Sequence, residues 1–169
     1  MSKSSDVTSI VVAGLGGQGV LKASDIIAEA AFRAGLDVKK SEVHGMSQRG
    51  GSVASDVRFG GEVLSPMVPE GEADFLVLVD AGQLGPNRNL LRPRGILIHP
   101  GLINPGVIAS RKSLNVALVG VLSAWLSIPE EHWRAAVRAS LSERLHETNL
   151  AAFQAGRAAA LQQRKEAQG

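Results

Sequence analysis

A run of glycines near the start of the sequence is the first candidate for chemistry. Gly14, Gly16 and Gly19 fit the pattern G-x-G-x-x-G, and Gly17 and Gln18 lie inside it. Such glycines let the backbone turn sharply and approach a ligand, and a helix that begins here offers free N–H groups and a positive dipole end to a phosphate. A tight strand-to-helix turn packed on neighbouring backbone needs glycines too. The pattern therefore leaves phosphate binding and pure packing both open.

An NAD site would need one further residue. An acidic side chain about 20 residues beyond the last glycine, at the end of the second strand, holds the ribose hydroxyls in such sites. Lys39 occupies that position and Lys40 follows it, with Asp37 and Glu42 as the nearest acids. The sequence therefore does not favour an ordinary NAD site, and the two lysines suit either a phosphorylated ribose or solvent exposure.

Residues 42–51 form a second polar, glycine-rich cluster, which predicts a loop of special geometry rather than a core strand. Arg49 has a planar guanidinium that suits a carboxylate or phosphate, although an arginine that binds loop carbonyls is an equal alternative. His44 is either a proton carrier or ligand, or a hydrogen-bonded structural residue. The candidate binding residues of this cluster are His44, Ser47, Gln48, Arg49 and Gly50.

Several kinds of chemistry are excluded or disfavoured because the sequence lacks the residues that they require. The chain has no cysteine, which excludes disulfides, thiol nucleophiles and cysteine-ligated zinc or iron–sulfur sites. No H-E-x-x-H, G-x-S-x-G or P-loop lysine occurs. With no tyrosine and only six aromatic residues, base stacking on nucleic acid is also disfavoured. We therefore expect no catalytic residue and no metal ligand in this chain.

Apolar patterning predicts the elements that position these residues. The fold class expected is α/β, a three-layer Rossmann-like sandwich with a mostly parallel sheet and a helical C-terminal third. The expected strands and helices are a strand at 9–13, a helix at 20–34, an extended segment at 36–38, a hairpin at 52–64, strands at 74–80 and 95–99 around a short helix near 83–91, an enclosed helix at 114–126, a helix opened by a capping box at 127–130, and a last helix from about 144 to 164.

The length of 169 residues predicts one domain, at residues 9–157. Residues 1–8 are expected to be extended or disordered, and residues 158–169 to be a fraying helical tail. The longest nearly apolar run, 116–128, is shorter than the ~20 residues that cross a bilayer. The polar N-terminus and the missing cysteines point to the cytoplasm.

Positive charge gathers in the second half of the chain. Residues 81–169 carry eleven basic and five acidic side chains, and 81–129 carry no acid at all. The cations of this stretch are Arg88, Arg92, Arg94, Arg111 and Lys112. They suit a phosphorylated ligand or an acidic partner, or form a solvated face.

Several motifs together resemble a known family. They are residues 13–20 and 42–53, Ser65-Pro66, Ala73-Asp74, residues 115–120 and residues 148–156. These resemble the gamma-type subunit or domain of the pyruvate/2-oxoacid:ferredoxin oxidoreductases, and most of all the small (beta) subunits of indolepyruvate oxidoreductases. The likeness covers about residues 8–157, and the first two motifs are much more specific than G-x-G-x-x-G.

The resemblance implies a subunit that is not a complete enzyme. Such complexes decarboxylate a 2-oxo acid on thiamine diphosphate, pass electrons through 4Fe–4S clusters and transfer the acyl group to coenzyme A. Thiamine diphosphate and the clusters would lie on a thiamine-binding and a ferredoxin-like partner subunit. The substrate would be an aryl 2-oxo acid such as indolepyruvate or an arylglyoxylate, and electrons would leave to ferredoxin or an NAD-linked subunit. Gly16–Gly19 and Arg49 would contact coenzyme A, and no nucleic acid or membrane partner is implied.

One departure from the family and two other functions stay open. Between Ile98 and Asn115 the family usually has a further strand and helix, whereas this chain has only a short segment. A free-standing nucleotide-binding module without catalysis is one alternative. A purely architectural subunit, whose glycines serve only packing, is the other.

Overall fold

The computed structural model describes residues 7–44 and 51–169. Five strands form one sheet in the order β2-β3-β1-β4-β5. They are β1 (Thr8–Leu15), β2 (Asp37–His44), β3 (Ser52–Gly60), β4 (Ala73–Leu78) and β5 (Leu91–Ile98). β4 is parallel to β1 and β5, whereas β3 is antiparallel to both of its neighbours, β1 and β2. Four of the five strands therefore run in the same direction, which confirms the expected α/β class with a mostly parallel sheet.

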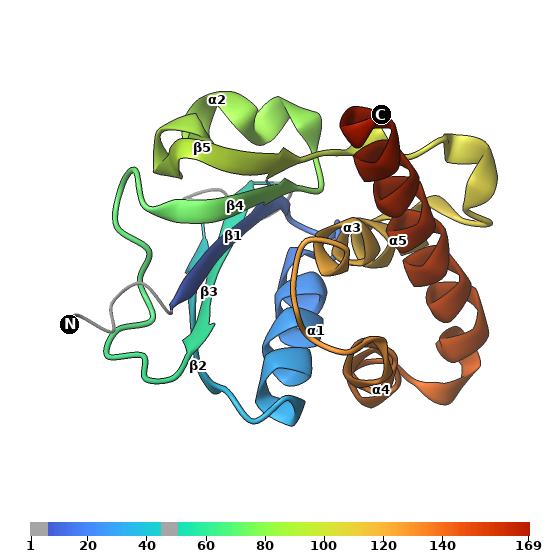
Figure 1. Cartoon of the computed structure of the whole chain (residues 1–169), viewed down its shortest axis with the longest axis horizontal. Coiled ribbons are helices and arrows are strands. Elements are labelled where there is room, and N and C mark those ends of the chain that lie inside the picture. Colours follow the sequence, from blue (N-terminus) through green and yellow to red (C-terminus); the bar gives the residue numbers. More distant parts are fainter. Residues whose placement is uncertain (1–6, 45–50) are drawn as a thin grey trace.

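Four helices lie on one side of the sheet (Figure 1). They are α1 (Val20–Arg33), α3 (Leu114–Ser123), α4 (Glu130–Ser140) and α5 (His146–Gln168). α1 and α3 pack on the strands, and α4 and α5 pack on these two helices. The opposite face has a thinner cover, made in part by the short helix α2 (Leu84–Asn87) and the turns around it. Leu84 and Leu90 of this segment pack against the buried cluster on this face, which includes Leu76 and Leu78 of β4. The sandwich thus has three layers, of which the third is thin.

β1 lies in the middle of the sheet and is buried on both faces. Ile10 and Val12 belong to the cluster under the helices, and Val11 and Ala13 to the cluster on the other face. All four are fully inaccessible to solvent. A β-branched apolar run without alternation is the pattern of such a strand, and it fixes the glycine turn that follows in a rigid position.

α3 is enclosed on all sides, as its continuous apolar sequence predicts, and it crosses α5 at very short range. Gly120 lies against the Phe153 carbonyl group, and Gly156 against the Ala117 carbonyl group. A Cβ at either glycine would overlap the facing backbone. Trp133 of α4 stacks on Phe153, with ring centroids 6.2 Å apart. The C-terminal helices thus form one compact unit around α3.

The hairpin expected at 52–64 is wrong. β3 pairs antiparallel with β1 and β2 and not with residues 62–64. β2 is longer than the predicted segment 36–38 and extends into the predicted loop as far as His44. Residues 62–64 do not form a strand, because side-chain carboxylates accept the N–H groups of this loop instead. The Val63 N–H donates to Asp37 Oδ2 at 2.7 Å, and the Val68 N–H donates to Asp56 Oδ2 at 2.9 Å.

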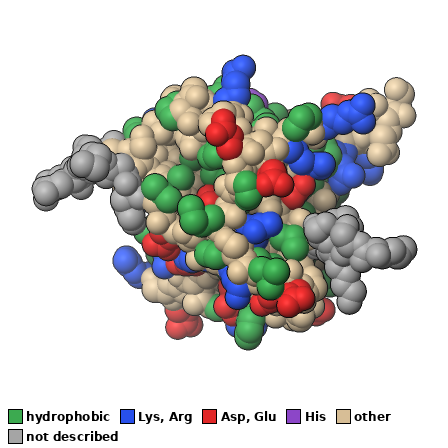
Figure 2. Space-filling view, turned by 90° about the vertical axis from the view of Figure 1, so that its left-hand side faces the viewer, with side chains coloured by type: hydrophobic (Ala, Val, Ile, Leu, Met, Phe, Trp, Pro, Cys, Tyr) green, Lys and Arg blue, Asp and Glu red, His purple; other side chains and the backbone are tan. Residues whose placement is uncertain are grey.

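The loop that replaces the expected strand leaves apolar side chains in solvent. Leu64 and Met67 are 85% and 61% exposed. Figure 2 views the molecule from the side of this loop and shows apolar side chains interspersed with charged ones. The surface on this side is therefore mixed in character.

Two smaller expectations about helix ends also differ. α4 begins after Pro129 without a side-chain cap, so the expected capping box at Ser127 does not form. α5 continues to Gln168, beyond the expected end at Arg164. In the part of the chain that the structure describes, no helix is both long and apolar enough to span a bilayer.

Candidate functional site

The glycine run forms the turn between the carboxyl end of β1 and the first turn of α1. Gly17 and Gly19 have φ angles of +85° and +82°, in the left-handed region that favours glycine. Gly19 is the N-cap of α1, and the side-chain amide of Asn115 occupies the space that a Cβ on Gly19 would need. Position 19 therefore requires glycine for its conformation and also for a close contact.

Gly14 and Gly16 are tied to neighbouring segments. A Cβ on Gly14 would lie 2.8 Å from Val20 Cγ2 and 3.3 Å from Val79 Cβ, so this glycine serves the packing of α1 on the sheet. The Gly16 N–H donates to the Gly51 carbonyl oxygen at 2.9 Å, just before β3 begins. Gly14 therefore serves packing, whereas Gly16 joins the turn to the segment before β3.

Gln18 holds the turn to the end of β4. Its Oε1 accepts a hydrogen bond from the Leu15 N–H at 2.7 Å, and its Nε2 donates to Asp80 Oδ2 at 2.8 Å. Both polar ends of the side chain are thus used within the protein. Gln18 positions the turn and Asp80 rather than reaching out to a ligand.

Asp80 follows β4 at the same edge of the sheet. Its Oδ2 accepts from Gln18 and its Oδ1 accepts from the Gly82 N–H at 2.8 Å. The hydrogen bond from Gln18, followed by that from Gly82, lowers the pKa of Asp80 below its ordinary value. Asp80 is therefore a fixed negative charge at neutral pH.

A cleft of about 670 Å³ opens between the glycine turn and the start of α3. Gly17, Gln18, Gly19 and Asp80 line one side of it, and Arg111 and Lys112 line the other. Both cations are exposed and directly precede α3. The cleft is thus built at the N-termini of two helices, α1 and α3, neither of which has an acidic residue in its first turn.

Asn115 joins the two helix starts. Its Nδ2 donates to the Gly19 carbonyl oxygen at 3.1 Å, while its Oδ1 is buried without a hydrogen-bond partner among the described residues. Only 6% of Asn115 is exposed. This side chain holds the cleft at a defined width.

The arrangement divides the cleft into two electrostatic parts. Helix N-termini and the guanidinium and ammonium groups of Arg111 and Lys112 attract an anion. The carboxylate of Asp80 repels one and accepts hydrogen bonds from hydroxyl or amino groups. A ligand that carries both a phosphate and hydrogen-bond donors fits this pattern.

The second predicted cluster is described only in part. Ser47, Gln48, Arg49 and Gly50 lie outside the described residues, as does the side chain of His44. The backbone of His44 pairs with Val53 at the end of β2 that lies beside the start of β3. The described residues on either side of the cluster therefore lie at the sheet edge that also carries the glycine turn.

The two lysines considered for a phosphorylated ribose lie elsewhere. They belong to β2, which β3 separates from β1, so position 39 does not adjoin the glycine turn. Partial burial would lower the pKa of Lys40, but hydrogen bonds with Asp25 and Glu42 outweigh this and raise it. Lys40 is thus a charged residue that links β2 to α1.

Sequence reasoning did not assign Asp80 or Asn115 to the site. Asp80 follows the strand parallel to β1, and residues just beyond the carboxyl ends of adjacent parallel strands gather at one edge. That rule offers a signal for Asp80. Asn115 opens the motif at residues 115–120, but its contact with Gly19 depends on how α3 packs, so the motif did not place it in the site. Among the described residues, no group of three acidic or histidine side chains is placed to hold a metal ion.

The family model of pyruvate ferredoxin/flavodoxin oxidoreductase matches residues 9–159. The chain belongs to this family, and the resemblance expected from its motifs is confirmed.

A curated relative is subunit IorB of the indolepyruvate oxidoreductase of Archaeoglobus fulgidus. It is 35% identical over 187 aligned positions, which cover 88% of this chain and 92% of the relative. Because the alignment is longer than this chain, the relative has residues without a counterpart here.

Two solved structures share the fold. The gamma subunit of a keto/oxoacid ferredoxin oxidoreductase from Geobacter sulfurreducens has a TM-score of 0.70 and 24% identity, covering 91% of this chain and 98% of that one. The 2-oxoglutarate:ferredoxin oxidoreductase of Magnetococcus marinus, solved with 2-oxoglutarate, coenzyme A and succinyl-CoA bound, has a TM-score of 0.77 and 23% identity. The match covers 92% of this chain but only 31% of that larger chain. The protein is thus a small subunit of an oxidoreductase family, homologous to IorB.

Proposed function

We propose that this chain is the accessory, gamma-type subunit of a complex that oxidatively decarboxylates an aryl 2-oxo acid, such as indolepyruvate or an arylglyoxylate, to an acyl-CoA. Thiamine diphosphate and 4Fe–4S clusters would be held by a thiamine-binding and a ferredoxin-like partner subunit, and ferredoxin or an NAD-linked subunit would accept the electrons. The similarity to IorB carries this proposal. The lack of cysteine supports it, because the clusters then need ligands from other chains.

The role of this chain in the complex is to bind and orient coenzyme A. Coenzyme A carries phosphates, which suit the positive groups of the cleft. It also carries ribose hydroxyls and an amino-substituted base, which can donate hydrogen bonds to Asp80. Its phosphate would lie against the first turns of α1 and α3 and the side chains of Arg111 and Lys112. Asp80 would accept a hydrogen bond from a ribose hydroxyl or an amino group.

Coenzyme A supplies the thiol that takes up the acyl group. The residues of this chain fix its polyanionic end, so that the thiol end reaches the partner subunit in one orientation. The residues predicted from the sequence for this role are Gly14, Gly16, Gly17, Gln18, Gly19, His44, Ser47, Gln48, Arg49 and Gly50. Of these, Gly14 and Gln18 would act indirectly, because they shape and hold the turn. Arg111 and Lys112 are added to these candidates because they line the cleft.

Purification of the chain with its partners from their native source tests the complex. The proposal expects a brown assembly with iron–sulfur absorbance that consumes an aryl 2-oxo acid only when coenzyme A is present. The isolated chain is expected to be colourless and inactive. A chain that purifies alone and turns over a metabolite without partners would contradict the proposal.

The alternative function is a free-standing nucleotide-binding module, which the glycine turn at a helix N-terminus favours. The same purification separates the two functions. A colourless monomer that retains a nucleotide and associates with no other subunit would support the module. We place the complex in the cytoplasm, where reduced clusters and coenzyme A are available to it.

A further inference from the structure

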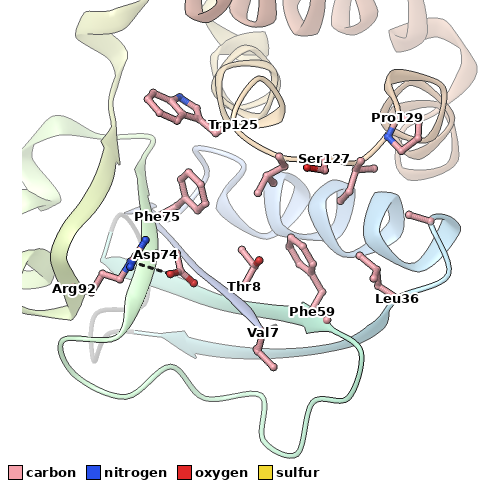
Figure 3. A pocket seen from close by; sticks show the side chains of 14 residues that line it. Val7, Thr8, Leu36, Phe59, Asp74, Phe75, Arg92, Trp125, Ser127 and Pro129 are labelled. Carbon is pink, nitrogen blue, oxygen red and sulfur yellow. Dashed lines mark ion pairs between the residues drawn. The ribbon is translucent and has the colours of Figure 1, made fainter. Parts of the chain in front are cut away.

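A second cavity lies at the end of the sheet opposite to the glycine turn. It has a volume of about 540 Å³ and is bounded by the starts of β1 and β4, the end of β3 and the connection between α3 and α4 (Figure 3). β1 starts here, at Thr8, and reaches the glycine turn after eight residues. The two sites are therefore separated by the length of this strand, roughly 25 Å. A ligand of this cavity is distinct from a ligand of the cleft.

Aromatic side chains form much of the wall. Phe59 and Phe75 are only 4% and 8% exposed and form a fixed apolar surface, whereas Trp125 is 39% exposed. The guanidinium of Arg164 lies over the indole of Trp125, 4.5 Å from the ring centroid, and also donates to the Ala124 carbonyl oxygen. The indole is thus held in place by α5 and does not need to be ordered by a ligand.

One cation lies beside this aromatic wall. Arg92 Nε forms an ion pair with Asp74, 2.9 Å from its Oδ1, and Asp74 Oδ2 accepts the Ser9 N–H at 2.8 Å. Figure 3 shows this ion pair at one side of the cavity. The two terminal amino groups of Arg92 have no hydrogen-bond partner among the described residues. Asp74 therefore aims the guanidinium while its own oxygens are already engaged.

We propose that this cavity binds an aromatic carboxylate, such as an arylacetate, with its carboxylate on Arg92 and its ring among Phe59, Phe75 and Trp125. A guanidinium with two free amino groups suits a carboxylate because both of its oxygens can accept parallel hydrogen bonds. Arg92 and Asp74 are the charged residues of the described lining, and Asp74 is committed to Arg92 and Ser9. The ring gains stabilisation from burial and from edge or face contacts with the aromatic wall.

Intrinsic fluorescence of the full chain tests this site directly. Without tyrosine, the signal comes only from Trp125 and the buried Trp133. Titration with phenylacetate, under excitation selective for indole, is expected to give a saturable change. Phenethylamine carries the same ring with a positive charge, and acetate carries the carboxylate without the ring. Both are expected to bind at least about tenfold more weakly than phenylacetate, as the loss of a charge-assisted hydrogen bond or of ring burial predicts.

Variants separate this site from a general attraction of anions. Arg92→Gln is expected to weaken the binding of phenylacetate at least about tenfold, because it removes the charge-assisted bonds. Arg94→Gln removes an equal charge two residues away, outside the lining, and is expected to leave binding unchanged. Calorimetry on Trp125→Ala is expected to show weaker binding as well.

The proposal is overturned if phenylacetate gives no saturable change, if acetate or phenethylamine binds as well, or if Arg92→Gln and Arg94→Gln behave alike. Circular dichroism of each variant identifies any loss of folding. If Arg92→Gln does not fold, Arg92→Lys retains the charge beside Asp74 without the fork and is expected to weaken binding to a smaller extent. None of these results depends on the partner subunits, so failure here leaves the proposed function standing.

Discussion

The side-chain amide of Asn115 donates a hydrogen bond to the carbonyl oxygen of Gly19 at 3.1 Å, across 96 residues of sequence. This contact joins the first turns of α1 and α3. The cleft lies where these two helices begin, so its width depends on one buried polar side chain. The electrostatic attraction of the cleft for an anion depends on the same contact, since it brings both helix N-termini together.

Replacement of Asn115 by alanine is expected to destabilise the protein by about 1–2 kcal/mol, because a partly buried hydrogen bond is lost and a small cavity forms in place of a buried side chain. Urea unfolding measures this change. Asn104→Ala is the control, since Asn104 accepts a hydrogen bond from Gly106 in an exposed turn. An equal loss of stability in the two variants would show that the contact between α1 and α3 contributes no more than a hydrogen bond in an exposed turn.

Gly19→Ala is expected to be more destabilising than Gly35→Ala. Both glycines have φ angles above +80°, which cost an alanine roughly 1–2 kcal/mol. A Cβ on Gly35 meets open space, whereas a Cβ on Gly19 overlaps the Asn115 amide. The difference between the free energies of unfolding of the two variants therefore measures the cost of the overlap with the Asn115 amide alone. Equal values would mean that Asn115 moves aside without cost.

Gly156→Ala is expected to lower the free energy of unfolding by about 1–3 kcal/mol, because an added methyl group must push α5 away from the Ala117 carbonyl of α3. Gly85→Ala is the matched control. Gly85 has open space around it, so that variant is expected to be neutral or slightly more stable. Thermal and urea unfolding check both. A Gly156→Ala protein as stable as the wild type would contradict the close crossing of α3 and α5.

The pKa of Asp80 makes stability depend on pH in the acid range. A carboxylate whose pKa is lowered in the folded state stabilises the protein above the ordinary pKa of 3.8, and this contribution is lost as the pH falls through the lower folded value. The wild type is therefore expected to exceed Asp80→Asn in stability near neutral pH, with the gap closing in acid. In a Gln18→Leu background the gap is expected to shrink, because the main cause of the lowered pKa is removed. A gap that does not vary with pH would contradict this assignment.

Much of the fold could be predicted from the sequence, because the patterns that indicate these elements are local. The unbroken apolar run at Ile10–Ala13 predicts a strand buried on both faces, and the apolar residues of α3 predict an enclosed helix. The position of the glycine turn between β1 and α1 follows from the same patterns. These elements needed no knowledge of distant contacts.

The remaining features depended on distant contacts. Residues 62–64 have the alternation of a strand, but Asp37 and Asp56 accept the loop's N–H groups, and β2 takes the place beside β3. Asn115 enters the site only through the packing of α3. Arg111 and Lys112 belong to a basic stretch, and the sequence did not show what these cations bind. The structure places both residues in the lining of the cleft.

Calorimetric titration of the assembled complex with coenzyme A tests the central claim, that this chain holds the anionic end of the ligand for chemistry on a partner subunit. The double substitution Arg111→Ala and Lys112→Ala is expected to weaken the affinity at least about tenfold, as the loss of charge-assisted hydrogen bonds predicts, and to make it less sensitive to salt. Arg88→Ala with Arg94→Ala removes the same charge outside the cleft and is expected to leave the affinity unchanged. If both double variants bind coenzyme A as tightly as the wild type, the cleft is not its site.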